Sequence, residues 1–167
     1  MVPQIKKILY ATDLTTNSLY AFYFAADLAR KLDAKIVVLH CTGPIPKKTK
    51  ERKITENIAE IKKRLQEFCL KVEPQIGSFG VDRVSEIIVR EGYPVEEILD
   101  AADAKECDVI IMGTHGKGWL KQTFLGSVAR SVLERSRKPV LIIPLPSEKT
   151  SAELGTGQKL YLFAHDF

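Results

Sequence analysis

Residues 108–130 read DVIIMGTHGKGWLKQTFLGSVAR, in which an apolar strand runs into three glycines and a later Gly126–Ser127 pair opens a helical pattern. Glycine lets the backbone approach a ligand closely and adopt positive φ. The free N–H groups at a helix N-terminus attract phosphate oxygens, and the helix dipole adds to that attraction. Ser127 can cap the helix and also donate its hydroxyl to a phosphate. The segment therefore predicts a phosphate-binding cradle, with an ordinary strand-to-helix turn as the alternative.

Other candidate polar groups lie at or near strand ends. Asp13 follows the first predicted strand, where its carboxylate could accept hydrogen bonds from an adenine amino group or a ribose hydroxyl, or could cap the next helix. Cys41 ends the second strand. It is interpreted as a small packing residue and not as a redox sensor, because no basic neighbour obviously lowers its pKa. His40 is interpreted as a hydrogen-bonded structural histidine, since no carboxylate partner is evident. His115 could donate to a phosphate or contact only solvent.

The glycine segment does not carry the residues of an efficient phosphoryl-transfer enzyme. Lys117 and Lys121 could screen phosphate charge, but the GxxxxGK[S/T] order of a Walker loop is absent. No residue is evidently placed to orient an attacking water. The pattern favours nucleotide binding without efficient catalysis. The alternative is a slow ATPase, or a protein that phosphorylates itself on Ser127 or Thr114.

Apolar runs and helical periodicities alternate along the whole chain. Strands are predicted at residues 5–11, 35–41, 81–89, 109–112 and 140–145. Helices are predicted at 19–32, 49–72, from Tyr93 and Pro94 onward, and at 127–136. This alternation predicts one α/β domain with a doubly wound, mostly parallel sheet and helices on both faces. Ligands bind such sheets at the carboxyl ends of the strands, which places Asp13, Cys41 and the Gly113 loop on one rim.

Composition narrows the functional classes. The chain has 167 residues, 45% of them apolar and 28% charged, which suits one soluble globular domain. The net charge is only +4, and the basic cluster at 47–53 has no interleaved aromatic residues, so nucleic-acid binding is not predicted. Because no apolar run could span a membrane or serve as a signal-peptide core, we expect a cytoplasmic protein. The three cysteines lack metal-ligand spacing, so no zinc site is expected.

The glycine spacing carries a family resemblance. Gly113-x2-Gly116-x9-Gly126-Ser127 matches the Gly-x2-Gly-x9-Gly-[Ser/Thr] signature of the ATP-binding branch of the universal stress protein family. The likeness covers roughly residues 4–145, including the segments KKILYATDL, IVVLHC and SRKPVLIIP. It implies a five-stranded parallel sheet in the order 3-2-1-4-5.

The resemblance also implies a ligand set. Contacts to adenine and ribose are implied for Ala11, Thr12, Asp13 and Cys41, with Met112 and Gly113 beside the ribose. Phosphate contacts are implied for His115, Gly116, Gly126, Ser127, Val128 and Ala129. The resemblance implies ATP as the cofactor, with a Mg²⁺ or Mn²⁺ ion held by the phosphates and no metal ligands from the protein. The chain departs from the family's frequent proline at Ala11 and frequent valine at Cys41, which affects adenine packing more than phosphate binding.

The resemblance therefore implies an ATP-binding regulatory protein of the stress response. ATP occupancy is expected to order the Gly113–Gly126 loop and change a surface that a partner protein reads. The short edge strand Val140–Ile143 is implied to pair with a second copy in a homodimer. Residues 1–146 are predicted to form the nucleotide-binding domain. The tail, 147–167, is predicted to add a strand or to dock on the partner subunit.

Overall fold

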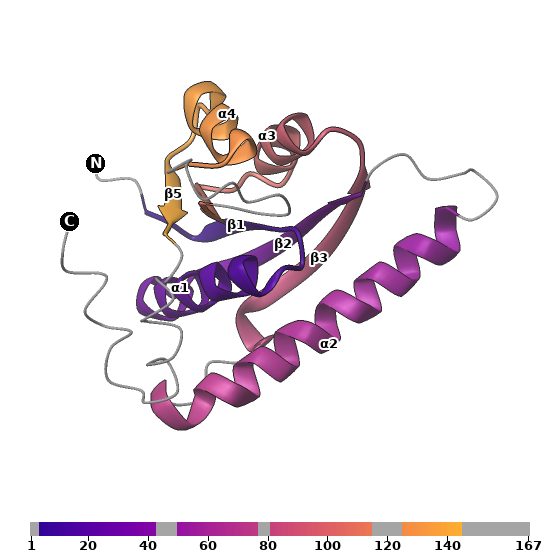
Figure 1. Ribbon diagram of the computed structural model, residues 1–167. Coiled ribbons are helices and arrows are strands. Elements are labelled where there is room, and N and C mark those ends of the chain that lie inside the picture. The colour runs from indigo at the N-terminus through magenta and orange to yellow at the C-terminus, as the bar shows by residue number, and fades with distance from the viewer. Residues whose placement is uncertain (1–3, 43–49, 77–80, 115–124, 145–167) are drawn as a thin grey trace.

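Parallel strands form one sheet with helices on both faces in the computed structural model of the protein (Figure 1). The structure describes residues 4–42, 50–76, 81–114 and 125–144. The five strands lie in the order β3-β2-β1-β4-β5, so the predicted fold class and strand order are confirmed. The strands are β1 (Lys7–Thr12), β2 (Lys35–Thr42), β3 (Val84–Glu91), β4 (Val109–Gly113) and β5 (Val140–Ile143). The helices are α1 (Thr16–Leu32), α2 (Lys50–Ile76), α3 (Pro94–Ala104) and α4 (Ser127–Arg135), with a 3₁₀ turn at Val81–Arg83.

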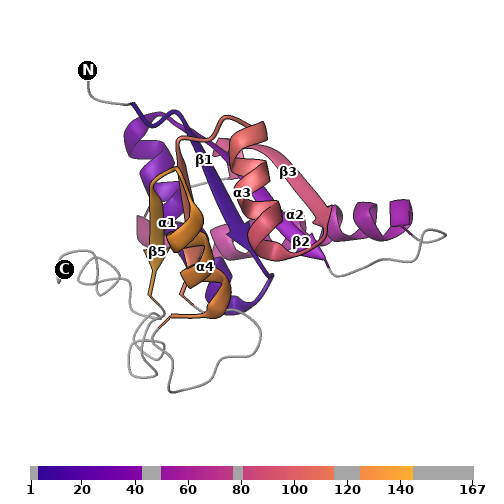
Figure 2. The same cartoon turned by 90° about the horizontal axis from the view of Figure 1, so that it is seen from above.

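Helices α1 and α2 cover one face of the sheet with a core rich in aromatic side chains. Tyr10 of β1 packs against Phe22 of α1, with ring centroids 5.2 Å apart. Ile61 and Leu65 of α2 are fully buried in the same core. Figure 2 shows the N-terminal end of α2 extending past β3. Burial of Ile61 and Leu65 accounts for the helical spacing of the apolar residues in this part of α2.

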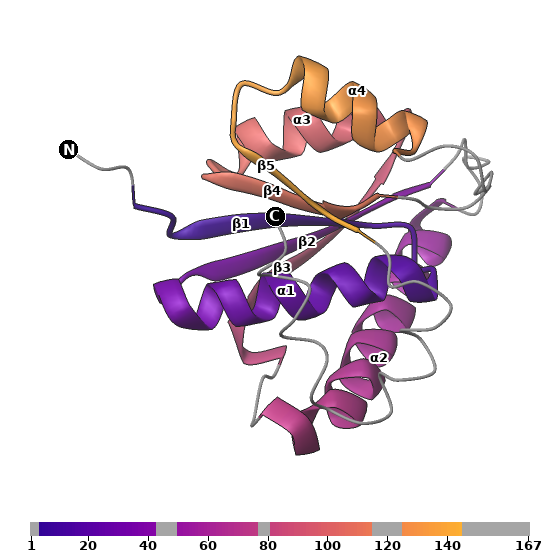
Figure 3. The same ribbon diagram turned by 60° about the vertical axis from the view of Figure 1, so that its left-hand side comes forward.

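Helices α3 and α4 cover the opposite face with smaller side chains (Figure 3). Ala101 and Ala102 of α3 and Ala129 of α4 are buried against strand residues that include Leu9 and Ile110. Small residues at these positions allow the helices to approach the sheet closely. Because both faces are covered, the central strands are continuous apolar runs.

Element boundaries differ from the predictions at several ends. The third strand begins at Val84, because Val81–Arg83 form a 3₁₀ turn instead of its first residues. The second helix continues to Ile76. The fifth strand ends at Ile143, and the following Pro144 has no N–H with which to extend the ladder. None of the described helices is long and apolar enough to cross a membrane.

Candidate functional site

The strand register brings the two separate parts of the predicted site to the same edge of the sheet. Thr12 of β1 is level with His40 of β2, next to Cys41. On the other side of β1, Tyr10 pairs with Ile111 of β4. Continuing that register sets Thr12 level with Gly113. Figure 3 shows α4 beginning at this same edge. The predicted convergence of Asp13, Cys41 and Gly113 on one rim therefore agrees with the described geometry.

The turn after β1 is held by a network of side-chain hydrogen bonds. Asp13 Oδ1 accepts hydrogen bonds from the Thr15 backbone N–H at 3.1 Å and from the Thr15 hydroxyl at 2.6 Å. Thr15 is the residue that caps α1, since its side chain accepts a hydrogen bond from the Ser18 N–H. Asp13 is thus not the helix cap itself: it holds the cap residue in place. This contact fixes the direction of the Asp13 carboxylate.

Buried polar groups support the turn from beneath. His40 is buried, and its Nδ1–H donates to the Thr12 carbonyl oxygen at 2.9 Å, so its interpretation as a hydrogen-bonded structural histidine agrees with the structure. The Thr12 and Ser18 hydroxyl oxygens lie 2.8 Å apart. The Tyr10 hydroxyl donates to the Ser18 carbonyl oxygen. Burial raises the pKa of Tyr10 well above its usual value, so the phenol stays protonated and acts as a donor.

Arg64 also contacts the turn, although no pattern in the sequence indicates it. Its guanidinium donates to the carbonyl oxygen of Leu14, a residue 50 positions earlier in the chain. Leu14 has φ 66°, in the left-handed region that leucine seldom adopts. No local motif marks this contact, because it depends on how α2 packs across the sheet.

The second part of the site is the junction between β4 and α4. The Thr114 N–H donates to the Ile143 carbonyl oxygen at 3.0 Å, which continues the ladder between β4 and β5. The Gly126 N–H then donates to the Thr114 carbonyl oxygen at 2.7 Å. This pair of bonds places the start of α4 against the end of β4. Predicted contacts His115 and Gly116 lie outside the described residues.

The start of α4 corrects two details of the predicted cradle. Gly126, not Ser127, is the N-cap: its backbone is extended at φ −63° and ψ 154°, and its carbonyl oxygen accepts from the Arg130 N–H. Ser127 is the first helical residue and its side chain is exposed. Among the described glycines only Gly92 has positive φ, so a positive φ does not explain why glycine occupies positions 113 and 126.

The remaining predicted contacts line the same edge. Ala11, Met112 and Ala129 are buried and Val128 is half-buried, all in the core between the sheet and helices α3 and α4. Cys41 is half-buried, and burial raises the pKa of its thiol to about 12; the nearby Glu97 carboxylate raises it further and Arg90 opposes the change. A neutral thiol fits the predicted packing role. Within the described ranges, His, Cys, Asp and Glu side chains form no group of three that could hold a metal ion.

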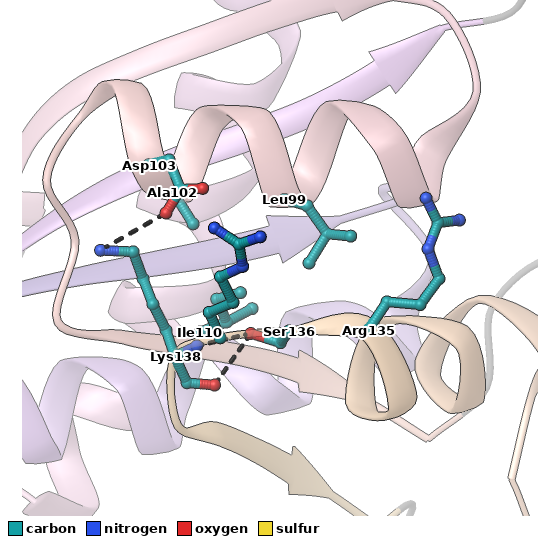
Figure 4. A pocket seen from close by; sticks show the side chains of 8 residues that line it. Leu99, Ala102, Asp103, Ile110, Arg135, Ser136 and Lys138 are labelled. Atoms are coloured by element: carbon teal, nitrogen blue, oxygen red, sulfur yellow. Dashed lines mark hydrogen bonds and ion pairs between the residues drawn. The ribbon is translucent and has the colours of Figure 1, made fainter.

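A cavity of about 150 Å³ lies away from this site, near the opposite edge of the sheet (Figure 4). Leu99, Ala102 and Ile110 form apolar parts of its lining. Lys138 Nζ lies 3.6 Å from Asp103 Oδ1, and the Arg135 guanidinium lies 2.8 Å from Glu96 Oε1. These ion pairs tie α3 to α4 and to the segment after it. The cavity is therefore a gap between two helix ends and does not overlap the predicted ligand contacts.

Comparisons with known proteins give one consistent family. Residues 4–144 match the model of the Universal stress protein family. The universal stress protein MJ0531 of Methanocaldococcus jannaschii is 34% identical over 146 residues, covering 86% of this chain and 85% of the relative. A universal stress protein from Thermus aquaticus is 32% identical over 139 residues, covering 83% of this chain and 98% of the relative.

Solved structures agree with that result. The structure of protein MJ0577, also from Methanocaldococcus jannaschii, has a TM-score of 0.62 and 28% identity, covering 87% of this chain and 100% of its own. The universal stress protein from Archaeoglobus fulgidus in complex with dAMP has a TM-score of 0.53 and 25% identity, covering 83% of this chain and 97% of its own.

Proposed function

The chain belongs to the universal stress protein family, and we propose that it binds an adenine nucleotide, ATP with Mg²⁺ or Mn²⁺, across the carboxyl edge of its sheet. The junction of β4 with α4 carries the proposal. Because the first bond within α4 runs from the Arg130 N–H to the Gly126 carbonyl oxygen, the helix leaves the N–H groups of residues 127–129 to other acceptors. Such a helix start attracts phosphate oxygens. The dAMP complex of the Archaeoglobus fulgidus relative supports an adenine nucleotide as the ligand.

In this proposal the nucleotide spans both parts of the site. Adenine and ribose lie over the ends of β1, β2 and β4, and Asp13 accepts hydrogen bonds from the adenosine. The phosphates lie over the glycine segment and the start of α4, and they hold the divalent ion. The adenosine contacts are Ala11, Thr12, Asp13, Cys41, Met112 and Gly113. The phosphate contacts are His115, Gly116, Gly126, Ser127, Val128 and Ala129.

The proposed role is regulatory. ATP occupancy changes the surface formed by the glycine segment, and a partner protein reads that change in the cytoplasm. The edge strand β5 pairs with a second copy of the chain: it lies at the edge of the sheet, and its residue Leu141 is 41% exposed. The tail 147–167, which follows the nucleotide-binding domain 1–146, adds to this dimer as a strand or a docking segment. Light scattering of the purified protein tests the dimer, and a monomer would reject it.

The alternative is slow ATP hydrolysis or self-phosphorylation. Of the two predicted acceptors, Thr114 is only 6% exposed while Ser127 is exposed, so Ser127 is the better placed. In that reaction the Ser127 oxygen attacks the γ-phosphorus, ADP leaves, and the hydroxyl proton passes to water. Single-turnover assays for ADP and phosphoprotein distinguish this reaction from binding, because binding alone forms neither product.

The experiment that tests binding starts with protein purified under native conditions. The protein is denatured and any released nucleotide is identified by mass, after which ATP, AMP and GTP are titrated calorimetrically with magnesium. We expect ATP to be released or to bind with clear preference over GTP. If no adenine ligand is released and none produces heat, the family assignment stands but the nucleotide proposal is wrong.

A further inference from the structure

Arg64 links the long helix α2 to the turn that carries Asp13. One guanidinium nitrogen donates to the Leu14 carbonyl oxygen, and the other lies 2.7 Å from Glu60 Oε1, one turn earlier in α2. The Glu60 pair orients the guanidinium along the helix. The Arg64 side chain is 42% exposed, so it reaches the turn from the surface instead of filling the core.

The turn needs such a contact because its backbone conformation is unfavourable. Leu14 has φ 66°, and a non-glycine residue in the left-handed region is held there by its surroundings. The Leu14 N–H donates to the Thr12 hydroxyl at 3.0 Å, and the Leu14 carbonyl oxygen accepts from Arg64. Both backbone polar groups of Leu14 are therefore held by side chains, one from β1 and one from α2. Removing Arg64 releases the carbonyl side of this arrangement.

The same turn fixes Asp13. Its carboxylate is aimed by two hydrogen bonds from Thr15, the residue after Leu14. A rotation of the Leu14 peptide therefore moves Thr15 relative to Asp13 and changes the direction of the carboxylate. Binding sites whose groups are already oriented bind more tightly, because less ordering occurs on association.

We propose that Arg64 is a positioning residue for the adenosine end of the site: through the Leu14 carbonyl it holds the 13–15 turn, and with it Asp13, ready for the ligand. This inference rests on the proposed adenine-nucleotide binding. Within that function, Arg64 acts by holding the turn and not by attracting the negative charge of the phosphates.

The test compares Arg64→Met, Arg64→Lys and Lys63→Met by calorimetric titration with AMP and with ATP and magnesium. Methionine keeps much of the apolar stem of Arg64 and removes its donors. Lys63 is the matched control: it is the neighbouring cation on α2, its side chain is 76% exposed, and it lies 3.9 Å from Glu67. We expect Arg64→Met to weaken both ligands by the same factor, about tenfold. Arg64→Lys restores part of the affinity, and Lys63→Met binds like the unchanged protein.

Hydrogen exchange supplies the second measurement. In ligand-free Arg64→Met, the amides of Leu14 and Thr15 exchange faster while those of β1 and β2 keep their protection. Loss of protection throughout the sheet would instead indicate a folding defect and overturn the positioning role. Equal affinities in Arg64→Met and the unchanged protein would also overturn it, as would a loss that affects ATP much more than AMP and disappears at high salt. If the unchanged protein binds neither ligand, the proposed function itself fails.

Discussion

The two parts of the site are constructed in different ways. At the turn after β1, side chains set the geometry: Asp13 holds Thr15, His40 holds Thr12, and Arg64 holds Leu14. At the junction of β4 with α4, the hydrogen bonds that set the geometry run between backbone groups of Thr114, Gly126 and Ile143. We therefore expect a side-chain change at the turn to alter both folding and the proposed nucleotide binding. At the junction, we expect a substitution to weaken the proposed binding while the fold is kept.

Asp13→Ala has the largest expected effect and tests the coupled behaviour of the turn. It removes the acceptor of two hydrogen bonds from Thr15, so we expect the free energy of unfolding to fall by about 2 kcal/mol. Nucleotide affinity should fall at least tenfold in the same variant. Urea denaturation and calorimetric titration measure the two quantities. Asp13→Asn keeps an acceptor for Thr15 and should recover most of the stability; full stability in Asp13→Ala would contradict the account of the turn.

Gly126→Ala tests whether binding at the junction can be changed without changing stability. Gly126 has φ −63° and ψ 154°, a backbone conformation that alanine also adopts. The free energy of unfolding should therefore change by less than about 1 kcal/mol. A Cβ atom at this position obstructs close approach of phosphate, and ATP affinity should fall about tenfold. The same two measurements apply. Unchanged ATP affinity would show that the phosphates do not approach this part of the backbone.

Ser127→Ala sharpens the picture of the junction with a smaller change. The Ser127 side chain is exposed and does not cap α4, so stability should stay within about 0.5 kcal/mol. Loss of its hydroxyl removes one donor to phosphate while the backbone donors stay, and ATP affinity should fall about threefold. AMP and ATP titrations show which phosphate is affected. Ser131→Ala, one turn later in α4, serves as the control and should leave both affinities unchanged.

The pH dependence of stability gives the smallest expected effect and concerns Cys41, beside the turn. Burial raises the thiol pKa from its usual 9.0 to about 12, so the thiol is neutral in folded and unfolded protein below pH 9.0. Above that pH the unfolded chain loses the proton first, and stability declines as pH rises towards 12. Cys41→Val should reduce this decline without abolishing it, since burial also raises the pKa of Cys107, to about 11. Urea denaturation at pH 7 and pH 10 measures the difference; an identical decline in both proteins would contradict it.

The sequence was sufficient for the fold because the burial pattern is regular. Strands covered on both faces must be apolar throughout, and those runs alternate with helical spacing along the chain. The strand order followed from the family resemblance, and the structure confirms it. Errors fell at the ends of elements, such as Val81–Arg83, where backbone angles decide between strand and turn.

The sequence identified candidate site residues where a local pattern or a position at a strand end marks them. Asp13 and the Gly126–Ser127 pair stand out from their local context, so the sequence identified them as candidates. Arg64 did not, because it is 50 residues from Leu14 and its role depends on the packing of α2. Ser127 was wrongly predicted as the helix cap, because the cap is determined by the backbone angles of Gly126.

The most direct test of the account is whether one ligand reaches both parts of the site. Two-dimensional NMR of the ¹⁵N-labelled protein during titration with ATP and magnesium follows the amides of the β1 turn and of the α4 start together. We predict that the amides of Asp13 and Thr15 shift along the same saturation curve as those of Ser127 and Ala129. Shifts confined to one part, or none in either, would contradict the claim that a single adenine nucleotide joins them.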